Sequence, residues 1–229
     1  MTKTIDHPFA VAIDGPAGAG KSTMARRAAA ELNFVYVDTG AIYRTVGFAA
    51  LRAGIDPKNA DAVAALLPSL HLELQWTPDG VQHVVLNDDD LNGSIRQPEV
   101  SAAASQVSAV PAVRQFLLDT QRDVARTHNV IMDGRDIGTV VLPNADVKIF
   151  LSASPEVRAH RRWLELQAAG RPDTFEDVLK DMNERDYRDT HRAIAPLRCA
   201  EDAVKLDTSN LSLEESISEI LNIIREKTN

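Results

Sequence analysis

Five short apolar runs restrict the fold of this chain more than any other feature of its sequence. They occupy residues 9–13, 34–37, 130–132, 147–151 and 203–206, and each is followed by a polar or small residue. The apolar residues in each run are consecutive rather than alternating, which is typical of strands that helices cover on both faces. We therefore predict an α/β fold built on a doubly wound, five-stranded parallel sheet.

The residues that follow these runs indicate where a ligand would bind. They are Asp14, Asp38, Asp133, Ser152 and Asp207. In a doubly wound sheet the ligand lies beyond the carboxyl ends of the strands. We therefore expect these side chains to lie along the binding edge of the sheet.

Two stretches depart from the alternation of strand and helix. The segments HLELQWT and VQHVVLNDDDLNG flank a PDG turn and predict a small antiparallel β insert. A later stretch is highly charged, helical in pattern and broken at AAGRP, which predicts a helical hairpin that projects from the core as a lid. The predicted single domain comprises a core (about 1–59, 111–154 and 196–229), the insert (about 60–110) and the lid (about 155–195).

Composition excludes several classes of function. The chain has 229 residues, of which 44% are hydrophobic, and a formal net charge of -8. Nucleic acids and anionic membranes are bound by basic surfaces, so we expect neither as a partner. A compact anion can still be bound by a local cluster, and 18 of the 25 basic residues are arginines, whose planar fork suits phosphate.

The cysteine content and the N-terminus point to the cytoplasm. Cys199 is the one cysteine, so it has no partner for an internal disulfide and no spacing suited to zinc. The N-terminal MTKTIDHPFAVAIDG holds an apolar run too short for a signal peptide or a membrane span. We expect a cytoplasmic protein, and a monomer, because no long apolar surface stripe is evident.

The segment GPAGAGKS matches G-x-x-x-x-G-K-[ST] and stands where that motif must stand, after a strand and before a helix. Its backbone amides can converge on phosphate oxygens, while Lys21 bridges the terminal phosphates and Ser22 ligates Mg²⁺. We predict that the loop binds ATP or GTP with Mg²⁺. The residues assigned to it are Gly15, Pro16, Ala17, Gly18, Ala19, Gly20, Lys21, Ser22 and Thr23.

Other motifs narrow the class of P-loop protein. The Asn-Lys-x-Asp motif of GTPases and the glycine-rich signature helix of ABC-type ATPases are both absent from the sequence. Arginines are instead distributed along the chain, as in DTGAIYR, DGRDIGTVV and RDYRDTHR. Phosphoryl transfer between two anions needs such cations, together with a lid that excludes water.

At this point the chain resembles a known family, the bacterial cytidylate kinases, nearly end to end. The resemblance rests on IDGPAGAGKST, DTGAIYR, IRQPEVSAAASQVS, DGRDIGTVV, VKIFLSAS, RAHRR and ERDYRD..R.IAPL, in the same order. It implies transfer of the ATP γ-phosphoryl group to CMP or dCMP, and it makes the insert the NMP-binding region. Thr39 stands where the family often has Ser, and His191 where an uncharged polar residue is frequent.

The resemblance also implies roles for individual residues. The acceptor's phosphate would be held by Thr39, Arg44, Arg135 and Arg192, the sugar by Arg185 and Asp189, and the base by Ser105, Arg114 and Asp136. Catalysis would depend on Lys21, Arg135, Arg185 and Arg192, and ATP would also be contacted by Arg158, Arg161 and Arg162 of the lid. Cytosine suits this base site, because its N4 amino group donates to a carboxylate while N3 and O2 accept.

Simpler interpretations of the same residues remain open at the sequence level. The charges of RDYRDTHR could pair only with one another on a helix surface, and Arg114 and Arg122 could pair with neighbouring aspartates. Asp136 could pair with Arg135 or cap a turn, and Thr39 could cap the next helix.

Asp14 and Asp133 could each orient a Mg²⁺-bound water or bond backbone amides. No role is evident for Arg96, and nothing suggests a metal beyond Mg²⁺.

Two rival functions also remain. A related P-loop kinase for AMP, UMP or shikimate would share the core, although a shikimate site needs neither the antiparallel insert nor the pairing of Arg114 with Asp136. A nucleotide-dependent switch protein would have no phosphoryl acceptor and would hydrolyse ATP steadily without one.

Overall fold

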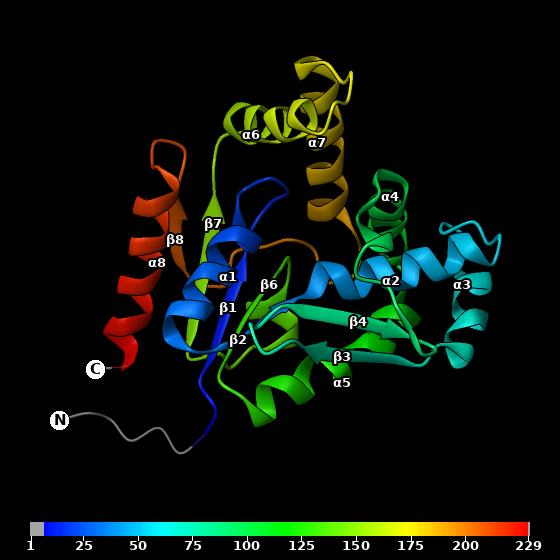
Figure 1. Ribbon diagram of the computed structural model, residues 1–229, viewed down its shortest axis with the longest axis horizontal. Coiled ribbons are helices and arrows are strands. Elements are labelled where there is room, and N and C mark those ends of the chain that lie inside the picture. The colour runs from blue at the N-terminus through cyan, green and yellow to red at the C-terminus, as the bar shows by residue number, and fades with distance from the viewer. Residues whose placement is uncertain (1–6, 229) are drawn as a thin grey trace.

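The computed structural model describes residues 7–228, so residues 1–6 and 229 of the predicted core lie outside the described residues. Its centre is a five-stranded parallel sheet in the order β2-β6-β1-β7-β8 (Figure 1). The strands are β1 (Ala10–Asp14), β2 (Val35–Asp38), β6 (Val130–Gly134), β7 (Val147–Ser152) and β8 (Val204–Asp207). Each coincides with one of the five apolar runs, which confirms the predicted sheet.

Alternate residues of β1 face opposite sides of the sheet and enter two separate cores. Val11 and Ile13 pack with α1 (Lys21–Leu32) and α8 (Leu213–Thr228), whose apolar face includes Ile217 and Ile224. Ala12 belongs to the other core, with α2 (Thr39–Arg52) and α5 (Pro111–Thr127). The sheet is therefore doubly wound, and its consecutive apolar residues follow from burial on both faces.

The insert holds a second, three-stranded antiparallel sheet, as predicted. Its order is β3-β4-β5, formed by β3 (Leu72–Trp76), β4 (Gln82–Leu86) and β5 (Asp89–Asp90). The sheet is flanked by α3 (Ala60–Leu66), η1 (Leu67–Ser69), η2 (Ser94–Arg96) and α4 (Pro98–Val107). Apolar residues of the insert join the same core as α2 and α5, so the insert is packed onto the central sheet rather than tethered to it.

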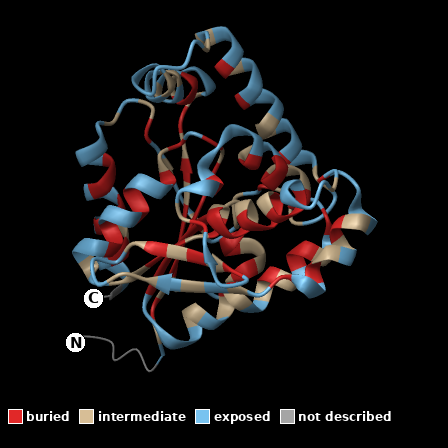
Figure 2. Cartoon of the chain, turned by 45° about the vertical axis from the view of Figure 1, so that its right-hand side comes forward, coloured by how far each residue is buried: buried red, intermediate tan, exposed pale blue. Residues whose placement is uncertain are grey.

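The charged stretch forms a helical hairpin of α6 (Pro155–Ala168) and α7 (Phe175–His191). It projects beyond the carboxyl ends of the central strands (Figure 1), and its surface is largely exposed, in contrast to the buried sheet (Figure 2). Ala159, Val178 and Met182 form a small core of its own. This position suits a lid, although the domain boundaries and the lid function remain predictions.

A short π-helical turn, η3 (Ile137–Val141), follows β6 at the carboxyl edge of the sheet. Within residues 7–228, no helix is long and apolar enough to cross a membrane.

Candidate active site

The loop between β1 and α1 has the backbone that a phosphate-binding loop requires. Gly15 has φ 153°, and a Cβ there would lie 2.0 Å from the carbonyl oxygen of Leu151 on the neighbouring strand, so only glycine fits. Gly20 has φ 85° and immediately precedes α1. Helix α1 therefore begins at Lys21, with its free N-terminal amides at the end of the loop.

Lys21 is buried in this loop and donates a hydrogen bond from Nζ to the carbonyl oxygen of Pro16 at 2.7 Å. Burial, the nearby guanidinium of Arg135 and that of Arg185 hold the pKa of Lys21 well below its usual value, although Asp133 and Asp14 oppose the shift. The ammonium group is thus stabilised less than it would be in water, and an anion beside it would restore that stabilisation.

The two aspartates whose roles were open at the sequence level now differ. The carboxylate of Asp14 accepts hydrogen bonds from the backbone amides of Ile137 at 2.8 Å and Gly138 at 2.7 Å, so it holds η3 in place. Burial raises the pKa of Asp14 to about 6 despite these bonds.

Asp133 instead accepts from the hydroxyl of Ser22 at 2.9 Å and from that of Tyr36 at 2.8 Å. Burial and the nearby Asp38 raise the pKa of Asp133. Hydroxyl and carboxylate oxygens are the hard ligands that Mg²⁺ prefers, so Ser22 and Asp133 fit a Mg²⁺ ion beside the loop. In the described part of the chain, no three acidic, histidine or cysteine side chains form a metal cluster. Any Mg²⁺ here would take its remaining oxygen ligands from water or from a nucleotide.

The arginines predicted from RDYRDTHR do not simply pair with one another along α7. Asp189 accepts a hydrogen bond from Nε of Arg135, which follows β6, at 2.9 Å. Burial opposes ionisation of Asp189, but Arg135 and Arg185 outweigh it and hold its pKa below the usual value. Arg185 is partly buried, and burial together with Arg135, Arg44 and Arg188 lowers its pKa to about 10 although Asp189 opposes the shift. The solvated-surface interpretation is therefore wrong for Arg185 and Asp189, although Arg188 is exposed and donates to the carbonyl oxygen of Glu184 within α7.

Helix α2, which directly follows β2, supplies a further cation, Arg44. Asp38 caps α2 by accepting from the amide of Ala41 at 2.9 Å, and it also accepts from Arg44 at 2.8 Å. Thr39 does not cap the helix: its hydroxyl donates to the carbonyl oxygen of Asp133 at 2.7 Å. Arg44 and Thr39 are thus held at the same edge of the sheet as the loop.

The residues assigned to the base form one buried group. Asp136 accepts hydrogen bonds from Arg114 and, at 3.2 Å, from Arg192. Burial nevertheless raises the pKa of Asp136. The alternatives, pairing of Arg114 with its helix neighbours and of Asp136 with Arg135, are therefore wrong.

Two neighbours complete this group. The guanidinium of Arg114 lies 5.6 Å from the ring centroid of Tyr43, within reach of a cation–π interaction. Arg192 also donates to the carbonyl oxygen of Ala195 at 2.6 Å, which keeps it beside Asp136. Its role toward phosphate remains a prediction.

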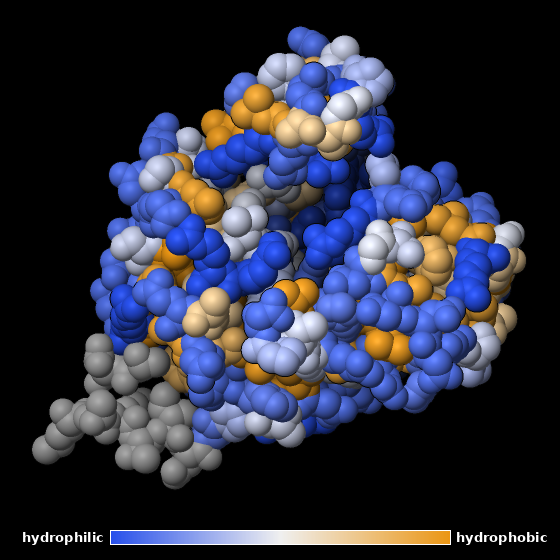
Figure 3. Space-filling model, viewed as in Figure 1, coloured by the Kyte–Doolittle hydropathy of each residue, from blue (hydrophilic) through white to orange (hydrophobic). Residues whose placement is uncertain are grey.

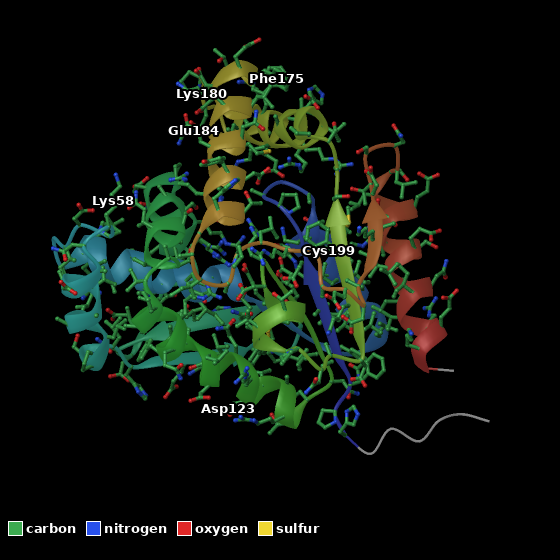
Figure 4. All side chains as sticks on the ribbon, turned by 180° about the vertical axis from the view of Figure 1, so that it is seen from behind. Lys58, Asp123, Phe175, Lys180, Glu184 and Cys199 are labelled. Atoms are coloured by element: carbon green, nitrogen blue, oxygen red, sulfur yellow. The ribbon has the colours of Figure 1, made fainter. Side chains whose placement is uncertain are left out.

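A cavity of about 520 Å³ lies between the insert and the lower part of α7. Ser105, Asp189 and Arg192 line it, together with Lys58, which lies just before α3 (Figure 4). Figure 3 shows the hollow beneath the hairpin, with hydrophilic side chains around it. Of the residues lining this cavity, Ser105 has its Oγ buried without a protein partner. Arg44 Nε and Arg185 Nε, in the group of cations at the edge of the sheet, are also buried without one. A ligand with hydrogen-bond acceptors, such as a phosphate, could satisfy these buried donor atoms.

Comparison with known proteins agrees with this geometry. Residues 11–226 match a family model described as cytidylate kinase. The chain belongs to the cytidylate kinase family. It is 48% identical over 218 residues to the cytidylate kinase of Ligilactobacillus salivarius (strain UCC118), covering 95% of this chain and 96% of that one. It is 46% identical over 217 residues to the cytidylate kinase of Desulfitobacterium hafniense (strain Y51), covering 95% of this chain and 93% of that one.

These relatives span nearly the whole chain, so the protein is a kinase, and a resemblance first based on motifs is confirmed. Among solved structures, an uncharacterized protein from Eubacterium ventriosum ATCC 27560 aligns with a TM-score of 0.53 at 10% identity, covering 95% of this chain and 98% of that one. At that identity the likeness shows a shared fold and nothing more.

The lid arginines of this cytidylate kinase family member have protein partners. Arg158 donates to the carbonyl oxygen of Ala17 at 2.9 Å and to Asp186 of α7 at 2.7 Å. Arg161 donates to the carbonyl oxygen of Thr208 at 2.8 Å, and Arg162 is exposed and pairs with Glu165. Contact of these three arginines with ATP remains a prediction.

The sequence predicts Asp38 at the binding edge of the sheet, but not that it caps α2 and holds Arg44. An Asp directly before a helix is a cap signal, so its role as the cap could have been recognised. Two other residues were missed: Tyr36, which supports Asp133, and Asp186, which ties α7 to Arg158. The partners of Tyr36 and Asp186 lie on other elements, so no local sequence pattern predicts these contacts. Arg122 donates to the carbonyl oxygens of Val140 and Val141 rather than to a neighbouring aspartate.

Proposed function

We propose that this kinase transfers the γ-phosphoryl group of ATP to CMP and dCMP, giving ADP and CDP or dCDP, with Mg²⁺ as cofactor. The observation that supports it best is the group of cations at the carboxyl edge of the sheet. Lys21 and Arg185 both have lowered pKa values, in part because Arg135 lies near each of them. Like charges this close are costly unless polyanions bind between them, as two phosphorylated substrates would.

The phosphate loop and the cations divide the work of transfer. The loop amides and Lys21 bind the phosphates of ATP. The acceptor's phosphate is held from other elements by Thr39, Arg44, Arg135 and Arg192, while Arg185 meets the sugar and adds positive charge to the transfer site. The acceptor is already an anion at neutral pH, so no general base is required. Catalysis then consists of positioning and charge neutralisation by groups that are already in place.

Ser22 and Asp133 are the residues that would hold Mg²⁺, directly or through water, because their oxygens meet beside the loop. Bound there with ATP, the ion would neutralise charge on the β- and γ-phosphates. The hairpin of α6 and α7 would close over the nucleotide and keep water from the transferred group.

Base selection follows from Asp136. Its carboxylate, held by Arg114 and Arg192, offers acceptor oxygens that suit the amino group at position 4 of cytosine. Uracil presents a carbonyl oxygen there, and two opposed acceptors cost about 1 to 3 kcal/mol. We therefore expect kcat/KM for CMP to exceed that for UMP by about 5- to 150-fold.

The biological setting completes the proposal: a cytoplasmic monomer of pyrimidine nucleotide metabolism, acting on small-molecule substrates and not on nucleic acid. The compartment and the oligomeric state can be tested separately, the latter by size exclusion.

The function is tested by ADP release from ATP with CMP, dCMP, UMP and AMP offered separately at equal concentration. Turnover with CMP and dCMP well ahead of the others is expected. A preference for UMP or AMP would leave the ATP-binding role of the phosphate loop intact but would refute the role of Asp136 in binding the base. Omitting Mg²⁺, with a chelator present, should stop turnover with every acceptor.

A further inference from the structure

The edge strand β2 is completed by side chains of the small sheet instead of by another strand. The amide of Val35 bonds to the carbonyl oxygen of Asn129 just before β6, so residues 36 and 38 direct their peptide groups to the opposite side. There, Trp76 donates from Nε1 to the carbonyl oxygen of Tyr36 at 2.9 Å. Figure 1 shows the small sheet beside this edge.

Gln82 contacts the same edge of β2 through two hydrogen bonds, both to the backbone of Asp38. Its Oε1 accepts from the amide of Asp38 at 2.7 Å, and its Nε2 donates to the carbonyl oxygen of Asp38 at 3.3 Å. Gln82 stands directly opposite Trp76 in the antiparallel pair of β3 and β4, and it is buried. One cross-strand pair therefore bonds the outward-facing backbone groups of two residues of β2, Tyr36 and Asp38.

Asp38, whose backbone Gln82 binds, also orients Arg44 through its side chain. One carboxylate oxygen of Asp38 accepts from the amide of Ala41, and the other accepts from Arg44 at 2.8 Å. The side chains of Asp38 and Arg44 are only 15% and 20% exposed, and Nε of Arg44 is buried with no protein partner. The direction of the Arg44 guanidinium therefore depends on the orientation of Asp38.

We propose that Gln82 is a positioning residue for the phosphoryl acceptor, acting through Asp38 on Arg44. This inference rests on the proposed function, in which Arg44 holds the acceptor's phosphate. Within residues 7–228, no hydrogen bond joins Gln82, Asp38 or Arg44 to the phosphate loop. The effect should therefore fall on the acceptor and not on ATP.

Gln82→Met tests this, because methionine keeps the length of the side chain and removes both hydrogen bonds. The KM for CMP should rise about 5- to 30-fold, the value of roughly one buried hydrogen bond, while the KM for ATP stays within twofold. Trp76→Phe is the matched control. It removes the neighbouring bond to the same edge strand without touching Asp38, so the KM for CMP should stay within twofold.

A purely structural role predicts a different result. If Gln82 only docks the insert, both variants lower the melting temperature and change the two KM values alike, or change neither. That outcome overturns the proposal, as does an unchanged KM for CMP in Gln82→Met. Inactivity of the wild type toward CMP would instead refute the proposed function itself.

Gln82→Glu covers the case in which the methionine variant does not fold. Glutamate can still accept from the amide of Asp38. It cannot donate to the carbonyl oxygen of Asp38, and its carboxylate would repel that oxygen. The KM for CMP should rise in the same direction, again with little change for ATP. A KM for CMP equal to that of the wild type would refute the proposal here too.

Discussion

Replacing Arg185 by methionine should make the protein more stable and nearly inactive. Burial and the nearby Arg135 lower the pKa of Arg185 from its usual value to about 10. One pKa unit corresponds to about 1.36 kcal/mol, so keeping Arg185 charged lowers the free energy of unfolding by on the order of 3 kcal/mol. Partial solvent access reduces that to about 1 to 2 kcal/mol. Since the folded-state pKa is the lower one, the cost is fully present below pH 10 and fades above it.

The assay is thermal unfolding at pH 7 together with steady-state turnover. For a chain of this size 1 kcal/mol corresponds to about 2 to 4 °C, so Arg185→Met should melt about 2 to 8 °C higher. Its kcat should fall about 100-fold or more, because a cation of the transfer site is lost. Lys180→Met, on the outer part of the same helix (Figure 4), should change neither quantity appreciably.

Adding ATP sharpens the test. ATP should raise the melting temperature of the wild type more than that of Arg185→Met, because its phosphates compensate the crowded cations. A variant that melts lower than the wild type, or that keeps wild-type turnover, would refute the view that this arginine is held at a cost for the sake of an anionic substrate.

Three further predictions concern other residues of the site. Lys21→Met should abolish phosphoryl transfer, and measurable CDP formation by this variant would contradict the role of the loop. Asp136→Asn should reduce the ratio of kcat/KM for CMP over UMP by about 5-fold or more, because an amide can donate to uracil; an unchanged ratio would place base selection elsewhere. Asp14, with a folded pKa of about 6 against 3.8 unfolded, should contribute progressively less to the free energy of unfolding as pH rises from about 4 to 6. Carboxyl NMR titration would show it, and an apparent pKa near 4 would count against it.

The sheet and the loop were predictable because their signals are local. A strand that is buried on both faces consists of consecutive apolar residues, and a phosphate loop must stand between a strand and a helix. The partners of the charges were not predictable in the same way. Asp189 belongs to a helix on which Arg185 and Arg192 are its natural neighbours, yet it pairs with Arg135 from the end of β6. That choice depends on how α7 docks, which no spacing along the chain encodes.

The same limit explains the lid arginines and the edge of β2. The motif RAHRR suggests nucleotide contact, but Arg158 reaches Ala17 and Asp186, which lie far from it in sequence. Gln82 looks like an ordinary polar residue of an alternating strand. Its contact with Asp38 exists only because the insert packs against the core.

The central claim is that the cations of the site hold two phosphorylated substrates for transfer between them. The most direct test is to supply ATP labelled in its γ-phosphate, with Mg²⁺ and CMP, and to follow the label. Our account predicts that the label appears in the β-phosphate of CDP, that this depends on CMP, and that little inorganic phosphate forms. Label released as inorganic phosphate at one rate with or without CMP would contradict it and would indicate a nucleotide-driven switch.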